Sequence, residues 1–269
     1  MKLGIFDSGL GGLLVAKSIK AHMPSLDMIY LGDTLHVPYG NRSEEAIYEY
    51  CYRGVDFLFS QGCNLVIMAC NTGSAAALRR LQQEYLPGRY PDRRILGVVV
   101  PTLEAAVELG HEKIGLIATN YIIQSDIYEE ELQRINPKVA IYPKATPLLV
   151  PLIENDGMEW IGPIIRTYLQ PLMAQKIQSL ILGCTHYPFL KSLIRKEVGD
   201  DLILLSQDEI IPQKLEEYLK RHPEISEALG RSGIQEFFVT DVTDAYQRSA
   251  RFIYNKEIFI GKANIWDLH

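Results

Sequence analysis

The sequence has no apolar run long enough to cross a membrane, and it has few cysteines. A membrane-spanning helix needs roughly 18 consecutive apolar residues, and no stretch approaches that length. The four cysteines, at positions 51, 63, 70 and 184, form no Cys-x-x-Cys pair and no metal-like spacing. The first residues also lack a basic-then-apolar signal pattern. We therefore expect a cytoplasmic protein with free thiols and no membrane partner.

Basic charge is also scarce. Lys and Arg number 27 against 33 Asp and Glu, which gives a net charge of −6 and argues against a nucleic-acid partner. The glycine-rich residues 7–12 lack both the G-x-G-x-x-G spacing and the Lys-Ser/Thr pair of nucleotide loops. We therefore expect no cofactor and no metal. An anionic ligand would have to be held by local donors.

Short apolar segments alternate with helical patterns along the whole chain of 269 residues. Expected strands cover residues 3–6, 28–31, 65–69, 95–100, 113–117, 139–142, 180–182, 202–205 and 237–240. This alternation is typical of α/β proteins with doubly wound parallel sheets. The length is sufficient for two modest domains, each with its own core.

The chain contains signs of an internal duplication. Residues 65–72 and 179–186 both run from an apolar segment through a small residue to a cysteine, Cys70 or Cys184, and then to polar side chains. Residues 2–8 and 113–119 match at a similar offset. We predict two pseudo-symmetric domains, residues 1–98 plus 209–269 and residues 99–208, with the active site in the cleft between them. Ligands of parallel sheets bind beyond the carboxyl ends of strands.

Two thiols on opposite walls of a cleft could form a redox disulfide or act as an acid–base pair. A single buried cysteine at a strand end is by default a small hydrophobic residue. Two at equivalent positions, each before a helix whose N-terminus lowers a thiol pKa, favour reactivity. Because no Cys-x-x-Cys motif is present, we prefer an acid–base pair, Cys70 and Cys184, that inverts a stereocentre.

Polar residues follow the same strands. Asp7 could assist one thiol or merely cap the next helix, and His186 could assist the other or pack as an ordinary histidine. Single hydroxyls and amides at strand ends are usually helix caps, but together they could bind a carboxylate at helix N-termini. The predicted cradle consists of Ser8, Asn71, Thr72, Thr119 and Thr185.

Five segments in the same order and spacing resemble bacterial glutamate racemases. They are residues 4–12, 38–40, 69–72, 147–154 and 183–188, and the resemblance extends over nearly the whole chain. It implies a cofactor-independent enzyme that interconverts L- and D-glutamate and supplies D-glutamate for peptidoglycan. Family members are often homodimers. A related racemase acting on aspartate or another amino acid, and a carboxylate-binding protein without turnover, remain alternatives.

The resemblance also implies roles for individual residues. Cys184 would remove the α-proton of L-glutamate and Cys70 that of D-glutamate, with His186 assisting Cys184 and Asp7 assisting Cys70. Substrate contacts would come from Asp7, Ser8, Tyr39, Gly40, Asn71, Thr72, Thr185 and His186.

The sequence departs from the family at several positions. Tyr121 and Ile122 stand where many members have Gly-Thr, and that threonine usually contacts substrate, so Thr119 would serve alone. Thr146 and Gly73 replace a frequent Cys and Ala, and residues 206–208 (Ser-Gln-Asp) also differ. None of these changes removes a predicted catalytic residue, so we expect activity.

Overall fold

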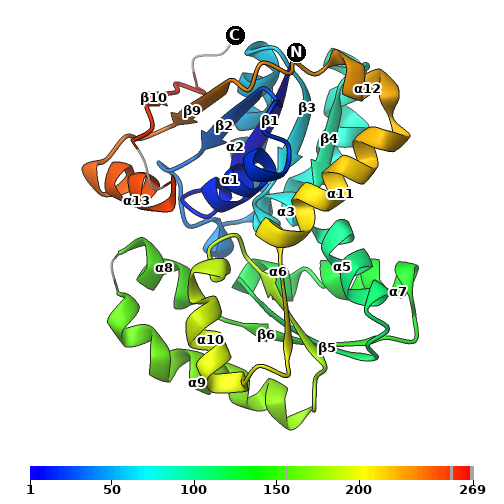
Figure 1. Cartoon of the computed structure of the whole chain (residues 1–269), viewed down its shortest axis with the longest axis vertical. Coiled ribbons are helices and arrows are strands. Elements are labelled where there is room, and N and C mark those ends of the chain that lie inside the picture. Colours follow the sequence, from blue (N-terminus) through cyan, green and yellow to red (C-terminus); the bar gives the residue numbers. More distant parts are fainter. Residues whose placement is uncertain (156, 255–256, 267–269) are drawn as a thin grey trace.

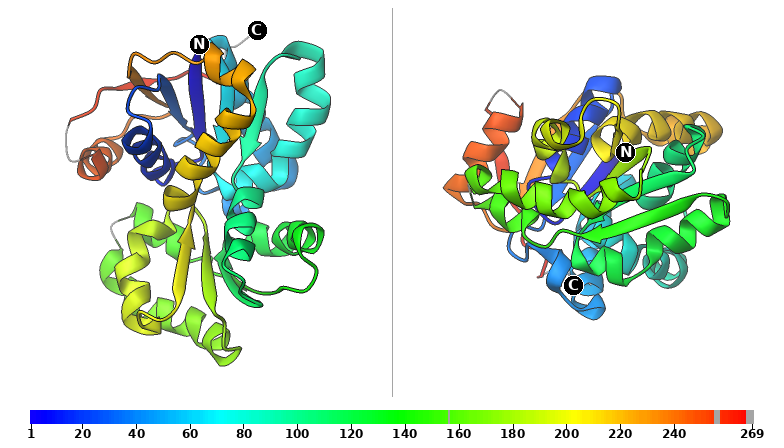
Figure 2. Two further views of the ribbon diagram at one scale, coloured as in Figure 1. Left: turned by 45° about the vertical axis from the view of Figure 1, so that its right-hand side comes forward. Right: turned by 90° about the horizontal axis from the view of Figure 1, so that it is seen from below.

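The computed structural model describes residues 1–155, 157–254 and 257–266. It consists of two lobes, each built on one parallel β-sheet with helices on its faces (Figure 1). The two lobes are also distinct in the left-hand view of Figure 2. The predicted α/β class with two parallel-sheet domains is therefore confirmed.

The first sheet has six strands in the order β10-β9-β2-β1-β3-β4, all parallel. Its strands are β1 (Lys2–Asp7), β2 (Met28–Gly32), β3 (Cys63–Met68), β4 (Arg94–Gly97), β9 (Gln235–Val239) and β10 (Ile260–Lys262). Every residue of β2 and β3 is buried, as expected for strands covered on both faces by helices. The late strands β9 and β10 thus return to the sheet begun by the N-terminus.

The second sheet has four parallel strands in the order β6-β5-β7-β8. They are β5 (Lys113–Ala118), β6 (Ala140–Ala145), β7 (Ser179–Gly183) and β8 (Ile203–Ser206). Their order repeats the arrangement β2-β1-β3-β4 of the first sheet, with β5 in the place of β1 and β7 in the place of β3. This repetition of topology matches the duplicated segments in the sequence.

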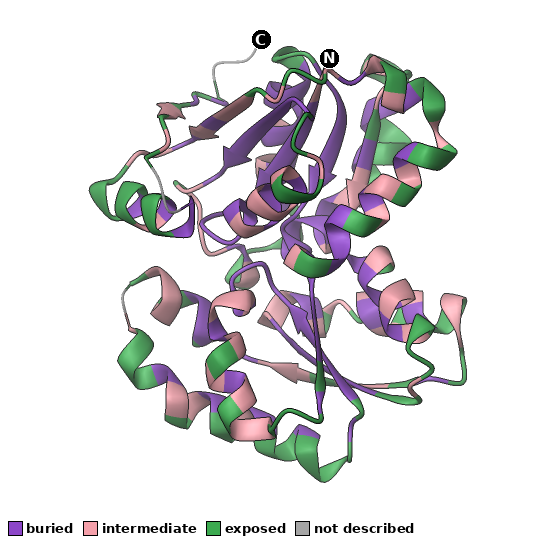
Figure 3. Cartoon of the chain, viewed as in Figure 1, coloured by how far each residue is buried: buried purple, intermediate pink, exposed green. Residues whose placement is uncertain are grey.

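Helices cover the sheets, and their exposed residues face outward (Figure 3). The upper lobe of Figure 1 carries α1 (Gly12–His22), α2 (Glu44–Ser60), α3 (Asn71–Arg80), α4 (Leu86–Arg89), α11 (Gln207–Arg221), α12 (Pro223–Ala228) and α13 (Asp244–Tyr254). The lower lobe carries α5 (Val99–Glu108), α6 (Asn120–Gln124), α7 (Ile127–Ile135), α8 (Leu149–Glu154), α9 (Ile161–Ala174) and α10 (Lys191–Val198). In the described part of the chain no helix is both long and apolar enough to span a membrane.

Two strand predictions were wrong at their ends. The expected strand 139–142 continues to Ala145 as β6. The expected strand 95–100 stops at Gly97, and α5 begins at Val99. Pro101 lies in the first turn of α5, where backbone N–H groups have no partner within the helix, so its missing N–H costs nothing. The apolar run 95–100 is therefore divided between the end of β4 and the start of α5. Strand β10 and helices α8 and α12 were not predicted because each is short, with three to six residues.

Candidate active site

The four central strands end at the two facing edges of the lobes. Asp7 is the last residue of β1, and Cys70 follows β3 as the N-cap of α3. In the other lobe Thr119 follows β5 as the N-cap of α6, and Cys184 directly follows β7. Because parallel strands end at a common sheet edge, residues far apart in the sequence meet there.

These strand ends enclose a pocket of about 30 Å³, which has room for little more than water. Ten of the eleven predicted site residues line it: Ser8, Tyr39, Gly40, Cys70, Asn71, Thr72, Thr119, Cys184, Thr185 and His186. Asp7 does not line the pocket but is hydrogen-bonded to Thr185, which does.

The Cys70 thiol lies on the wall formed by the first lobe. Its Sγ donates to Ser8 Oγ at 3.4 Å and accepts from the Gly73 backbone N–H at 3.4 Å. Burial raises the pKa of Cys70 to about 12, and the negative charge of Asp7 adds to this shift. We expected the helix N-terminus to lower this pKa, and that expectation was wrong, because the net shift is upward. The hydrogen bonds with Ser8 and with the Gly73 N–H at the helix start do lower it, but desolvation is the larger effect.

The Cys184 thiol lies beside a histidine–carboxylate pair. His186 Nδ1 is 3.6 Å from Cys184 Sγ, and its Nε2 is 2.5 Å from Glu154 Oε1. Burial opposes charge on His186, but the hydrogen bonds with Cys184 and Glu154 raise its pKa well above the ordinary value. Burial likewise opposes charge on Glu154, yet the bond from His186 leaves its pKa lowered. Both directions of pKa shift favour an imidazolium–carboxylate pair.

Asp7 is fully buried between the lobes. Its Oδ2 accepts from the N–H groups of Gly9 and Gly12 at the start of α1, each at 3.0 Å, and its Oδ1 accepts from Thr185 Oγ1 at 3.1 Å. Burial raises the pKa of Asp7, while the charge of His186 and these hydrogen bonds oppose the rise. The bond from the Gly12 N–H agrees with the interpretation of Asp7 as a helix cap. That Asp7 assists Cys70 stays a prediction, and its charge raises the pKa of that thiol.

Hydrogen-bond donors surround the rest of the pocket. Thr72 Oγ1 and Thr119 Oγ1 lie 3.0 Å apart and join the two lobes. The phenol of Tyr39 donates to the buried Asp33 at 2.6 Å, so the loop that carries Tyr39 and Gly40 is fixed against the first sheet. The N-terminus of α3 adds a favourable dipole for an anion.

The structure shows where the residues that depart from the family pattern lie. Ile122 is fully buried in the core of the second lobe and does not line the pocket. Thr146 lines the pocket, donates to the Ala118 carbonyl at 3.0 Å and bonds the Tyr187 hydroxyl at 2.6 Å. A methyl group at Gly73 would lie 3.0 Å from Cys51 Sγ, a tight but single contact.

Sequence reasoning assigned no role to Glu154 or to Thr146. Glu154 ends α8, a short helix that no periodicity predicted, and its partner His186 lies 32 residues further along the chain. The only feature of the sequence that pointed to Glu154 was its place in the segment 147–154, which resembles the family. Thr146 had a similar signal, as a position where the family often has cysteine.

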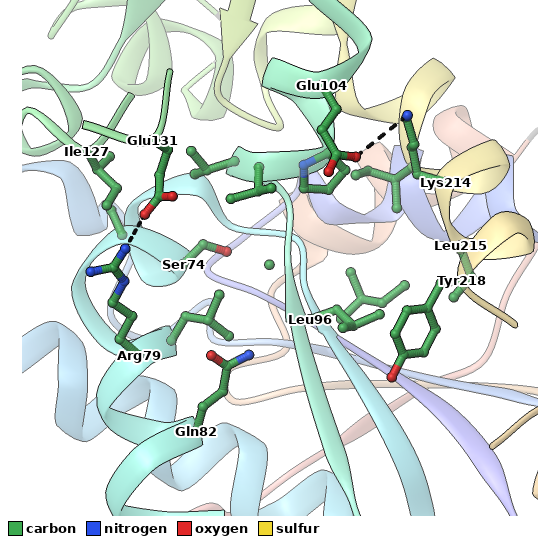
Figure 4. A pocket seen from close by; sticks show the side chains of 18 of the residues that line it. Ser74, Arg79, Gln82, Leu96, Glu104, Ile127, Glu131, Lys214, Leu215 and Tyr218 are labelled. Carbon is green, nitrogen blue, oxygen red and sulfur yellow. Dashed lines mark hydrogen bonds and ion pairs between the residues drawn. The ribbon is translucent and has the colours of Figure 1, made fainter. Parts of the chain in front are cut away.

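A larger cavity of about 380 Å³ lies elsewhere at the junction of the lobes (Figure 4). It is lined mainly by α3, α5, α7 and α11, and ion pairs join Arg79 to Glu131 and Lys214 to Glu104. None of the predicted site residues lines it. Among the described residues, no three His, Cys, Asp or Glu side chains gather as a metal site.

Known proteins are similar to this chain over most of its length. The model of the Asp/Glu/Hydantoin racemase family matches residues 14–205. The glutamate racemase of Aquifex aeolicus is 37% identical over 261 residues, covering 96% of both chains, and that of Paracoccus denitrificans is 36% identical, covering 89% of this chain and 92% of the relative.

Solved structures are similar over almost the entire length. Glutamate racemase RacE1 of Bacillus anthracis has a TM-score of 0.89 at 32% identity, covering 98% of this chain and 97% of the other. The Francisella tularensis glutamate racemase, solved with D-glutamate, has a TM-score of 0.88 at 27% identity, covering 99% and 98%. The chain therefore belongs to the Asp/Glu/Hydantoin racemase family and, within it, is an amino-acid racemase of the glutamate racemase group.

Proposed function

We propose that this protein interconverts L- and D-glutamate without a cofactor, using Cys70 and Cys184 as its acid and base. The observation that carries the proposal is that both thiols line one pocket, each contributed by a different lobe. Inverting a stereocentre requires groups on opposite faces of the carbon, and an origin of the two thiols in different lobes supports such an arrangement. The glutamate racemases similar to this chain support glutamate as the substrate.

In the direction from L- to D-glutamate, the Cys184 thiolate takes the α-proton, and Cys70 gives its proton to the opposite face of the carbanion. The cycle leaves Cys184 as thiol and Cys70 as thiolate, and the reverse direction starts from that state. The imidazolium of His186 is suited to stabilise negative charge on the Cys184 sulfur. Burial keeps the proton on Cys70 in the ligand-free form.

The difficulty of the reaction is the weak acidity of the α-carbon. Each pKa unit of mismatch between carbon acid and thiolate costs about 1.4 kcal/mol. Asn71, Thr72 and Thr185 supply donors whose hydrogen bonds to the substrate carboxylates would strengthen as charge moves onto them. A substrate that fills this small pocket would displace water from it, which would strengthen these electrostatic interactions further.

The proposal is tested by incubating the protein with a panel of L-amino acids in D₂O, without added cofactor, followed by chiral analysis. We expect α-deuteration with inversion for glutamate. Cys70→Ala and Cys184→Ala should each lower the rate by about 10²–10⁴-fold, the usual contribution of a general acid or base. Unchanged racemisation in both variants would refute the two-thiol mechanism. Exchange only with aspartate or another amino acid would change the substrate, and no exchange at all would favour a carboxylate-binding protein.

We further propose that the enzyme is a cytoplasmic homodimer that supplies D-glutamate for peptidoglycan. Four buried free cysteines are compatible with a reducing compartment. Rescue of a bacterial strain that requires D-glutamate would test the biosynthetic role, and analytical ultracentrifugation would test the dimer.

A further inference from the structure

The amide of Asn71 is held by two side chains outside the pocket. Its Oδ1 accepts from the hydroxyl of Tyr128 at 2.7 Å and from Gln207 Nε2 at 3.3 Å. Tyr128 and Gln207 are both fully buried, and neither lines the pocket. Tyr128 is the second residue of α7 in the second lobe, and Gln207 begins α11. The arrangement therefore fixes a pocket residue of the first lobe from two other elements.

The two donors determine which way the amide faces. An asparagine amide offers one oxygen acceptor and one nitrogen with two N–H donors. Because two donors already meet Oδ1, a rotated amide would bring its nitrogen against Gln207 Nε2, donor against donor. Gln207 Nε2 also lies 3.4 Å from Thr102 Oγ1, which donates to the Val98 carbonyl and so holds the glutamine in place. Among the described residues Gln207 Oε1 has no hydrogen-bond partner, so the contacts with Tyr128 and Thr102 are what favour this orientation of Asn71.

The opposite end of the amide is left free. Within the described residues, Asn71 Nδ2 is buried and has no hydrogen-bond partner. An unmatched buried donor costs about 1–3 kcal/mol, unless a ligand supplies the acceptor. Since Asn71 lines the pocket beside Cys70, the acceptor it lacks is one that a substrate carboxylate can supply.

We propose that Tyr128 and Gln207 are positioning residues that turn the N–H groups of Asn71 toward the substrate, so that this position selects a carboxylate oxygen. Gln207 belongs to the segment in which the sequence departs from the family, and the departure thereby acquires a role. The inference rests on the proposed function only in taking glutamate as the ligand.

The test measures the dissociation constant of D-glutamate by calorimetry, together with kcat and KM. Tyr128→Phe and Gln207→Leu should each weaken binding about tenfold, as expected when a hydrogen bond to a charged group is lost. The matched control is Tyr85→Phe, which removes a buried phenol bond of 2.5 Å to Asp56, remote from the pocket. It should lower stability similarly and leave binding unchanged.

A double-mutant cycle separates positioning from general destabilisation. In an Asn71→Ala background, neither Tyr128→Phe nor Gln207→Leu should weaken binding further. Additive losses in that background, or an equal loss in Tyr85→Phe, would overturn the inference. If the parent protein binds D-glutamate but does not racemise it, the proposed function fails, and the double-mutant cycle on binding still tests the inference. If the parent does not bind it, both fail.

Discussion

At the scale of single residues, the charge state of Cys70 is the property most open to direct measurement. Its ordinary pKa near 9 rises to about 12, first because the side chain is desolvated and second because Asp7 is nearby. The thiolate of Cys70 is measured as the difference in ultraviolet absorbance between the parent protein and Cys70→Ser. We predict that this difference is absent at neutral pH and appears only well above pH 9. Asp7→Asn should move that step to lower pH. A step complete below pH 9 would contradict the prediction.

The same shift predicts how stability depends on pH. A thiol whose pKa is higher in the folded than in the unfolded protein keeps its proton longer when folded. The folded state therefore binds more protons between pH 9 and 12, and stability falls as the pH rises through that window. Denaturant unfolding of Cys70→Ser should show a shallower fall than the parent.

At the scale of elements, helix α6 provides a test of the departure at Ile122. Ile122 is fully buried among Ile114, Leu116 and Tyr128 in the core of the second lobe. We predict that Ile122→Thr, which restores the residue frequent in the family, destabilises the protein by about 1–3 kcal/mol because it buries a hydroxyl among apolar groups. Denaturant unfolding measures this loss.

Substrate binding should be unchanged in Ile122→Thr, because the side chain does not line the pocket. Ile122→Val is the control: it keeps the apolar character and should cost only about 0.5–1.5 kcal/mol. A lower KM in Ile122→Thr would show that the position contacts substrate and would refute the prediction.

How much of the site could be predicted depends on the element that carries each residue. Cys70 and Cys184 follow fully buried strands, so an apolar run that ends in polar residues located both. Glu154 could not be located in this way, since its pairing with His186 depends on how α8 packs across the second lobe. The raised pKa of Cys70 was missed because burial depends on how the whole chain folds around the thiol. Its effect on the pKa is larger than that of the local hydrogen bond at the helix start.

At the scale of the whole molecule, we propose that the chain divides into residues 1–98 plus 209–269 and residues 99–208. The parallel pairing of β9 with β2 supports the assignment of the C-terminal part to the first domain. The chain crosses between the lobes twice, near the starts of α5 and α11. Native-state hydrogen exchange tests the division: β9 and β1 should lose protection together, and separately from β5.

The closeness of the two lobes depends on Gly11, which precedes α1. A methyl group at Gly11 would lie 2.4 Å from the backbone carbon of Thr185 and 2.6 Å from its oxygen, in the other lobe. The φ of Gly11 is −63°, which any residue adopts, so the cost of a side chain there comes from this contact alone. Backbone atoms cannot turn aside as a flexible side chain can.

We therefore predict that Gly11→Ala forces the lobes apart and separates Thr185 from Asp7, a pair now hydrogen-bonded at 3.1 Å. Because a misplacement of about 1 Å at a catalytic site can cost about 10²-fold in rate, kcat/KM should fall by that order. The control is Gly162→Ala in α9, where no atom lies within 4 Å of the added methyl group. That variant should keep its activity and gain about 0.5–1 kcal/mol of stability. Parental kcat/KM in Gly11→Ala would mean that catalysis does not require this close approach of the lobes.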